Sequence, residues 1–235
     1  LVQEVCSAAT PNGPKLDETR TEYALKINPP VIDGEIGVAD PDEWRFAAGN
    51  SDYWRVFPDP VLAPDGIRSG VLGSGPVPVD AADLSFNIYA GYDDKYLYVA
   101  VRVRDSVIST DSAAAGAMNG NTWEDDSVEV FVDGANANDA RWAAGQLGGQ
   151  FVITANNAYR ENEAANPGFG ETAAWFAKTS LTADGYDAEF RISLAILGNR
   201  KPGDVLGFTV AVNDDDAGGP GTRQVLWVGA AHEPV

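Results

Sequence analysis

The clearest strand pattern in the chain lies at residues 122–134. There Val128, Val130 and Val132 alternate with Ser127, Glu129 and Phe131. Because successive side chains of a strand point to opposite faces, the valines are predicted to face a core. The opposite parity also takes in Trp123 and Asp125, so one side carries an aromatic ring, two carboxylates and a hydroxyl. Such a side suits a sugar, which stacks on rings and donates hydroxyl protons. A polar strand face in solvent has the same pattern.

Further segments repeat the period of two. Residues 95–104 place Leu97, Val99, Val101 and Val103 on one side, and residues 206–212 do the same with Phe208, Val210 and Val212. The polar side of the first segment carries Arg102, which we add to the candidate ligand-binding residues. Other strands are expected at 22–28, 84–90, 150–155, 173–181, 186–192 and 224–228. Roughly eight to ten short strands without a long amphipathic helix predict an all-β protein, an antiparallel sandwich of jelly-roll type.

The chain is predicted to hold one domain. Residues 1–21 are expected to form an arm or linker, and residues 22–235 the sandwich. Within it, residues 49–82 are rich in proline and glycine and predict a long irregular insertion, a feature that is usually functional. Trp44 is expected to close one end of the core.

Charge and composition exclude several functions. With 35 acidic against 16 basic residues, the net charge of −19 argues against nucleic acid and anionic membranes as partners. No apolar run is long enough to span a membrane. A single cysteine and a single histidine argue against a zinc site or a Ser-His-Asp triad. Asp125 and Glu129 lie about 13 Å apart on one strand, beyond the spacing of glycosidase carboxylates, so no enzyme is predicted.

A series of landmarks resembles a known family. They are Ile32-Asp33-Gly34 with Trp44, Tyr96–Val101 ending at Asp105, Trp123–Asp133, Gly185-Tyr186 with Glu189, Gly207-Phe208 with Val212-Asn213-Asp214, and Arg223 with Trp227. In this order they closely resemble carbohydrate-binding module family 9, the DOMON-like sandwich domains. The resemblance covers about residues 30–229, and the block from Trp123 to Asp133 is its most specific part.

The resemblance implies a sugar site in which two tryptophans clamp the end of a glycan. Trp123 matches the first clamp residue, and Glu129 matches a carboxylate that accepts hydrogen bonds from sugar hydroxyls. Val152 and Ala211 stand where the family has an arginine and a glutamine, and the second tryptophan of the family falls beyond Trp227. A ring from the 49–82 insertion is the candidate to replace it: Trp54, Tyr53 or Phe57. The family further implies a non-catalytic, extracellular or cell-surface module of a larger multidomain protein, with a xylan- or cellulose-type glycan as partner.

Family members often carry calcium at strand ends. Asp105 and Asp126 each lie where a predicted strand ends or begins, and there free backbone carbonyls can complete a calcium shell. Asp214, with Asp215 and Asp216, forms a second acidic group. The predicted cofactor is therefore structural calcium, held by Asp105, Asp126 and Asp214. Acidic turns in solvent are the alternative.

Two other functions fit a sandwich of this kind. One is a structural or adhesive extracellular domain that has lost sugar binding, because a fold alone does not determine function. The other is a haem-binding relative of the superfamily, some members of which use a methionine with a histidine or a lysine as axial ligands. Met118 and His232 are the single residues of their types, and the small polar segment 109–121 around Met118 is a poor wall for a porphyrin.

Overall fold

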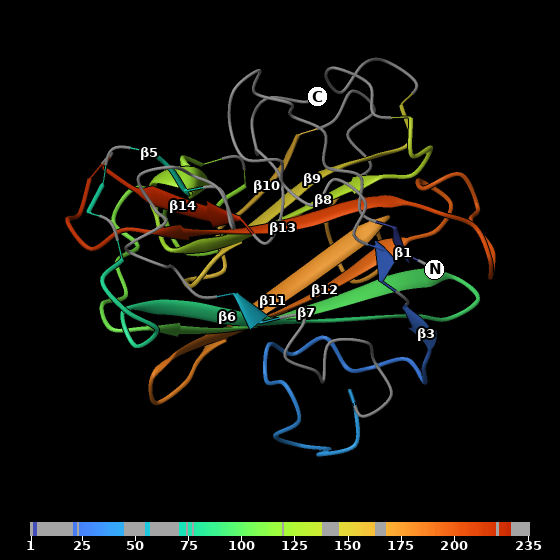
Figure 1. The fold of residues 1–235 in the computed structure, drawn as a ribbon, viewed down its shortest axis with the longest axis horizontal. Coiled ribbons are helices and arrows are strands. Elements are labelled where there is room, and N and C mark those ends of the chain that lie inside the picture. Colours follow the sequence, from blue (N-terminus) through green and yellow to red (C-terminus); the bar gives the residue numbers. More distant parts are fainter. Residues whose placement is uncertain are drawn as a thin grey trace.

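The computed structural model is a two-layered β-structure (Figure 1). It describes residues 2–3, 21–22, 24–44, 55–56, 71–73, 75–76, 78–118, 120–137, 146–162, 168–219 and 221–226. Across these residues the regular structure consists of strands and one short 3-10 helix, η3 (Thr122–Glu124). None of them belongs to a helix that could span a bilayer.

Two sheets of hydrogen-bonded strands form the layers. The first, called the β8 sheet, has the order β10-β9-β8-β13-β14-β5. Its strands are β10 (Tyr159–Asn162), β9 (Gly148–Thr154), β8 (Ser127–Asp133), β13 (Gly207–Asp214), β14 (Arg223–Leu226) and β5 (Val71–Gly73). The second, called the β7 sheet, has the order β11-β12-β7-β6-β3, and β4 also pairs with β6. Its strands are β11 (Trp175–Leu181), β12 (Gly185–Ser193), β7 (Tyr96–Asp105), β6 (Leu84–Tyr92), β3 (Leu25–Lys26) and β4 (Arg55–Val56).

The main core lies between the two sheets. Every residue that alternation predicted to be inside belongs to one buried cluster: Leu97, Val99, Val101, Val103, Val128, Val130, Val132, Phe208, Val210 and Val212. The β7 sheet adds large rings to it, including Trp175 and Phe190. Each such side chain contributes about 1.5–3 kcal/mol when it leaves water, so this layer is the main source of stability. The predicted sandwich is confirmed.

Some pairings differ from the expected pattern. The pairing of β3 with β6 is parallel, so the β7 sheet is mixed rather than purely antiparallel. β10 lies between the expected strands 150–155 and 173–181, where no strand is predicted, and β4 and β5 lie inside the predicted insertion. β1 (Val2–Gln3) lies in the predicted arm and pairs with β2 (Thr21–Glu22). These strands are short, and pairing with a neighbour determines their conformation where apolar alternation is too brief to predict it.

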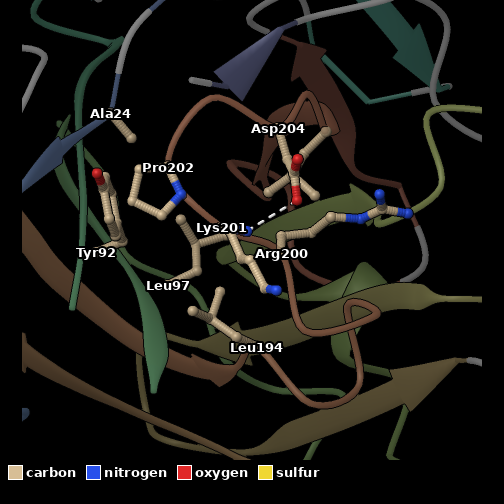
Figure 2. Close-up of a pocket in the computed structure, with 9 residues that line it drawn as sticks. Ala24, Tyr92, Leu97, Leu194, Arg200, Lys201, Pro202 and Asp204 are labelled. Carbon is tan, nitrogen blue, oxygen red and sulfur yellow. Dashed lines mark hydrogen bonds between the residues drawn. The ribbon is translucent and has the colours of Figure 1, made fainter. Parts of the chain in front are cut away.

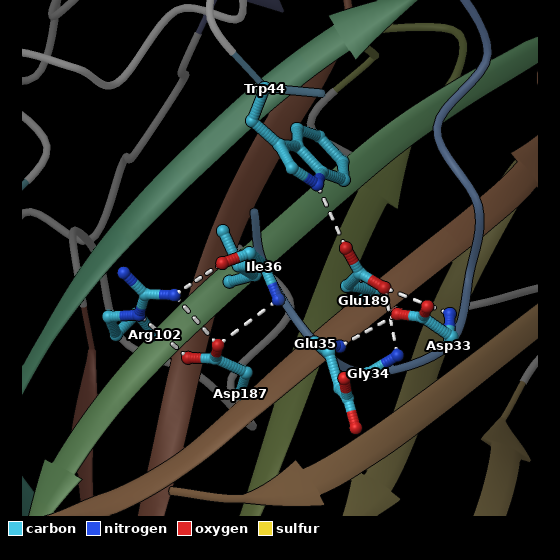
Figure 3. Close-up of polar contacts among 8 residues, drawn as sticks. All are labelled: Asp33, Gly34, Glu35, Ile36, Trp44, Arg102, Asp187 and Glu189. Atoms are coloured by element: carbon cyan, nitrogen blue, oxygen red, sulfur yellow. Dashed lines mark hydrogen bonds and ion pairs between the residues drawn. The ribbon is translucent and has the colours of Figure 1, made fainter. Parts of the chain in front are cut away.

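An N-terminal segment covers the outer face of the β7 sheet (Figures 1 and 3). Trp44 donates its indole N–H to Glu189 over 2.8 Å, and the same carboxylate accepts the Asp33 and Gly34 N–H groups. Burial raises the pKa of Glu189 to about 7. Trp44 is only 4% exposed, in a small cluster separate from the main core. Its predicted place at one end of the core is therefore wrong, because Glu189 holds it on the outside of the sheet.

A charged residue in the core should abolish this fold. Val130 is fully buried, and Val130→Asp is expected to prevent folding because a lone buried carboxylate costs several kcal/mol. Val38→Asp is the matched control, since Val38 is 67% exposed and should melt like the parent protein. Circular dichroism and thermal melting measure both variants. A cooperative transition of Val130→Asp at the parent temperature would contradict the assignment of the core.

Candidate functional site

The outer face of the β8 sheet carries a buried polar network centred on Glu129. The Glu129 side chain has no exposed surface. One carboxylate oxygen accepts the Gln150 side-chain amide, and the other accepts those of Asn213, at 2.6 Å, and Gln224, at 3.1 Å. Asn213 also donates to the Ser127 hydroxyl. The carboxylate is thus satisfied by three neutral donors, two from the strands beside β8 and one from the next strand, β14.

Strand register explains why these residues meet. Val152 on β9 and Ala211 on β13 lie directly opposite Glu129, one on each side. Directly paired residues point to the same face of a sheet, so these two apolar side chains flank the carboxylate. Gln150 and Asn213 lie two residues along from them and therefore also point outward. The two departures from the family pattern thus lie beside Glu129 itself.

Trp123 lies at the margin of this face. It belongs to η3, just before β8, and its side chain is 36% exposed. The Arg160 guanidinium carbon lies 4.6 Å from the centre of its ring, and the Thr222 hydroxyl donates to its backbone carbonyl. The prediction that Trp123 points away from the core by strand parity rests on a wrong premise, since the strand begins only at Ser127. The ring is nevertheless partly exposed.

The other predicted ligand-binding residues lie elsewhere. Asp125 is buried, and its two oxygens accept the backbone N–H groups of Ser112 and Ala113 at 2.7 and 2.8 Å. Burial raises its pKa, and these hydrogen bonds lower it. Arg102 lies on the outer face of the other sheet, where it pairs with Asp187 at 2.8 Å (Figure 3). Trp54 is outside the described residues. The structure therefore brings Glu129 and Trp123 to one face and gives Asp125 and Arg102 structural partners.

An acidic cluster lies at one end of the sandwich, where β7 and β13 end. Oxygen atoms of Asp105, Asp214 and Asp216 lie within 4.8 Å of one another. Both oxygens of Asp214 and one each of Asp105 and Asp216 are buried and have no hydrogen-bond partner among the described residues. Asp126 is adjacent but occupied, because its two oxygens accept the Ser109 and Asp215 N–H groups. The structure thus merges the two predicted acidic groups, with Asp216 in place of Asp126 as the third member of the cluster.

Electrostatics make this cluster costly without a counter-charge. Burial, followed by neighbouring carboxylates, raises the pKa of Asp214 to about 8. Burial and neighbouring carboxylates also raise the pKa of Asp126 to about 8. Burial raises the pKa of Asp105 to about 7, although a hydrogen bond from the Val107 N–H opposes this shift. Several buried carboxylate oxygens that converge without donors have the chemistry of a hard-cation site, and calcium prefers such ligands. The residues present therefore fit calcium.

A small pocket opens at another edge of the sandwich (Figure 2). Tyr92 and Leu97 line it from the β7 sheet, and Lys201, Pro202 and Asp204 from the segment before β13. Its volume is about 30 Å³, enough for a water-sized group. Ligand pockets for small organic molecules are about tenfold larger or more, so a sugar ring does not fit here. The open outer face of the β8 sheet is the stronger candidate.

Sequence reasoning missed Gln150, Asn213, Gln224 and Arg160 as members of the site. Gln150, Asn213 and Gln224 lie at polar positions of predicted strands, which is a detectable signal, whereas Arg160 lies where no strand is predicted. Strand order, however, decides which polar residues meet across a sheet. Register pairs Arg160 with Val152 and so places it in the same row as Glu129. Only the folded arrangement shows this neighbourhood.

Comparison with known proteins supports the resemblance. The chain is 34% identical over 202 residues to the Exoglucanase XynX of Acetivibrio thermocellus, an alignment that covers 84% of this chain and 14% of that protein. It is 29% identical over 202 residues to the Endo-1,4-beta-xylanase A of Thermotoga maritima, with 86% and 15% covered. The chain therefore spans a small part of the curated relatives that it matches.

Solved structures confirm the fold. A family 9 carbohydrate binding module from Caldicellulosiruptor kristjanssonii, in complex with cellotriose, superposes with a TM-score of 0.61 at 22% identity, covering 90% of this chain and 88% of the other. A module from the same organism in complex with glucose gives 0.58 at 22% identity, with 90% of each chain covered. Residues 73–233 also match the model of the family described as "Carbohydrate family 9 binding domain-like". This match includes most of the chain, and the chain belongs to that family of binding domains, as its landmarks predicted.

Proposed function

We propose that this chain binds an oligo- or polysaccharide on the outer face of the β8 sheet. The observation that carries the proposal is a carboxylate, Glu129, held only by neutral donors on a sheet face that has a partly exposed tryptophan, Trp123, at its margin. Sugar hydroxyls are themselves neutral donors, and pyranose C–H faces stack on aromatic rings. Both chemical requirements of a glycan are met within one region of the sheet.

The proposed binding replaces contacts inside the protein with contacts to the ligand. A sugar hydroxyl that donates to Glu129 takes the place of an amide such as that of Gln150 or Gln224. The net gain of such an exchange is small, about 1 kcal/mol per hydrogen bond. Val152 and Ala211 offer no side-chain donor beside the carboxylate. We therefore expect weak binding, with much of the affinity supplied by stacking on Trp123.

The ligand class is proposed from the relatives. The superposed modules were solved with cellotriose and glucose, and the curated relatives include an exoglucanase and xylanases. A cellulose- or xylan-type glycan follows as the expected partner. Because the chain matches only 14–15% of those two relatives' lengths, we further propose that it serves as the binding part of a larger secreted or cell-surface protein. Its net charge of −19 agrees with a partner other than nucleic acid.

A second candidate function draws support from the burial of Glu129. With no exposed surface and three amide partners, this carboxylate already has what a purely structural network needs. A sandwich that keeps this network and binds no sugar would serve as an adhesive or spacer domain. Sugar titration of the intact protein separates the two functions.

We also propose a structural calcium ion held by Asp105, Asp214 and Asp216. Their unpartnered buried oxygens supply the ligands, and the cation removes the repulsion among them. Asp126 lies next to this cluster and ties Ser109 to Asp215, while Asp125 ties the same loop at Ser112 and Ala113. The ion is thereby linked to the segment that presents Trp123.

Removal of the Trp123 ring tests the sugar site. Trp123→Ala is expected to lower affinity for cello- and xylo-oligosaccharides at least about tenfold, or 1.4 kcal/mol, because the stacking platform is lost. Its free energy of unfolding should fall by less than about 1 kcal/mol, since the ring is partly in solvent. Glu129→Gln should weaken binding less, because a neutral acceptor remains. Isothermal titration and thermal melting measure these effects.

Trp44→Ala is the matched control for this experiment. Trp44 is nearly fully buried on the other sheet, so its removal should cost about 3–5 kcal/mol of stability and leave sugar affinity of the folded fraction unchanged. If the parent protein binds no oligosaccharide, or if Trp123→Ala unfolds as readily as Trp44→Ala, the structural function replaces the sugar-binding one.

Chelation tests the calcium site. Calcium at about 100 times its Kd should add about 2.7 kcal/mol of stability, so a chelator should lower the Tm by several degrees and excess calcium should restore it. Asp214→Asn should remove most of this response, whereas Asp94→Asn, at an exposed carboxylate, should retain it. Identical melting curves with chelator and with calcium would show that no bound ion stabilises the fold.

A further inference from the structure

Arg160 occupies a distinctive place beside the proposed sugar face. It lies on β10, at the edge of the β8 sheet, and register sets it opposite Val152, the residue that pairs with Glu129. Its guanidinium carbon stands 4.6 Å from the centre of the Trp123 ring. The proposed stacking platform and a positive charge are therefore in direct contact.

This guanidinium has no hydrogen-bond acceptor among the residues that the structure describes. Of the arginines whose side chains the structure describes, Arg102 and Arg104 pair with aspartates, while the others donate to backbone carbonyls: Arg191 to Glu171, Arg200 to Leu197 and Arg223 to Gly75. Within this described set, Arg160 alone makes no hydrogen bond or ion pair and meets only the Trp123 ring. In a chain with 35 acidic residues, the absence of an acidic partner is notable, because such partners are abundant.

The chemistry of the pair indicates what it can recognise. A guanidinium is planar and permanently charged, and its forked N–H donors match the two oxygens of a carboxylate. Contact with the ring holds the cation in place and removes water from part of it, which strengthens its attraction for an anion. Neutral xylose and glucose residues carry no anion. A uronic acid carries one on an otherwise similar ring.

We propose that Arg160 is a specificity-determining residue that makes this site prefer glycans bearing a uronic acid. The inference rests on the proposed sugar-binding function and adds the acidic substituent to it. β10 and β8 are separated by β9, so the backbones of Arg160 and Glu129 lie about 10 Å apart. One ligand can thus place neutral hydroxyls near Glu129 and its carboxylate on Arg160, away from the buried negative charge.

Two matched ligands test this inference on the intact chain. Xylotriose and xylotriose with one glucuronic acid branch are titrated calorimetrically into the parent protein at low salt. The acidic ligand should bind about tenfold more tightly, the scale of one charge-assisted hydrogen bond at a partly exposed site. Added sodium chloride should reduce this preference, because salt screens exposed charges.

Variants assign the preference to Arg160. Arg160→Gln should bring the affinity ratio of the two ligands close to one, whatever its effect on the affinity for xylotriose itself, and Arg160→Lys should retain part of the ratio. Arg104→Gln, on the other sheet, is the matched control and should keep the full ratio. Melting curves establish that each variant is folded at the titration temperature.

The possible failures are distinct. Equal binding of the two ligands by the parent protein overturns the role of Arg160 and leaves the sugar-binding function in place. A preference for the acidic ligand that survives in Arg160→Gln also overturns the role of Arg160, because another residue then binds the uronic acid carboxylate. Binding of neither ligand overturns the proposed function and this inference together.

Discussion

A carboxylate without a cation at the centre of the β8 sheet constrains much of this structure. Removing a charge from water is costly unless hydrogen bonds replace hydration. Glu129 meets this condition through amides of Gln150, Asn213 and Gln224, which arrive from β9, β13 and β14. The network therefore requires four strands in one order and register. These donors are neutral amides, so a sugar hydroxyl can take the place of one of them. The carboxylate that holds the four strands together can therefore also accept a hydrogen bond from a sugar.

The period of two links this network to the core. Along β8, Val128, Val130 and Val132 enter the apolar layer, and the intervening positions hold the polar one. At the strand end, Asp126 and Asp125 bind backbone N–H groups of the loop that precedes η3. Core, polar face and acidic end thus depend on one short segment. A register shift of β8 by one residue would turn its valines outward and its polar residues inward, and would disrupt the core, the polar face and the acidic end together.

The sequence pattern within single strands predicted the features that depend on one strand alone. Alternation placed the ten core residues of β7, β8 and β13 correctly, and the landmarks identified the family. The contacts of Arg102 and Asp125 were not predictable in this way, because parity says which side of a strand a residue takes but not which sheet or loop lies there. Arg102 meets Asp187 from β12, and Asp125 is taken by the backbone of residues 112–113. The partners of Glu129 lie 21 to 95 positions away, so only the strand order reveals them.

The central claim is that a glycan binds on the outer face of the β8 sheet, which carries Glu129 and has Trp123 at its margin. A crystal structure of the chain with a bound cello- or xylo-oligosaccharide tests it most directly. The account predicts a sugar ring stacked on the Trp123 indole, with a hydroxyl that donates to the Glu129 carboxylate and at least one of its amide partners displaced. A sugar ordered on the outer face of the β7 sheet, or at the pocket beside Tyr92, with the Glu129 network unchanged, would contradict the account.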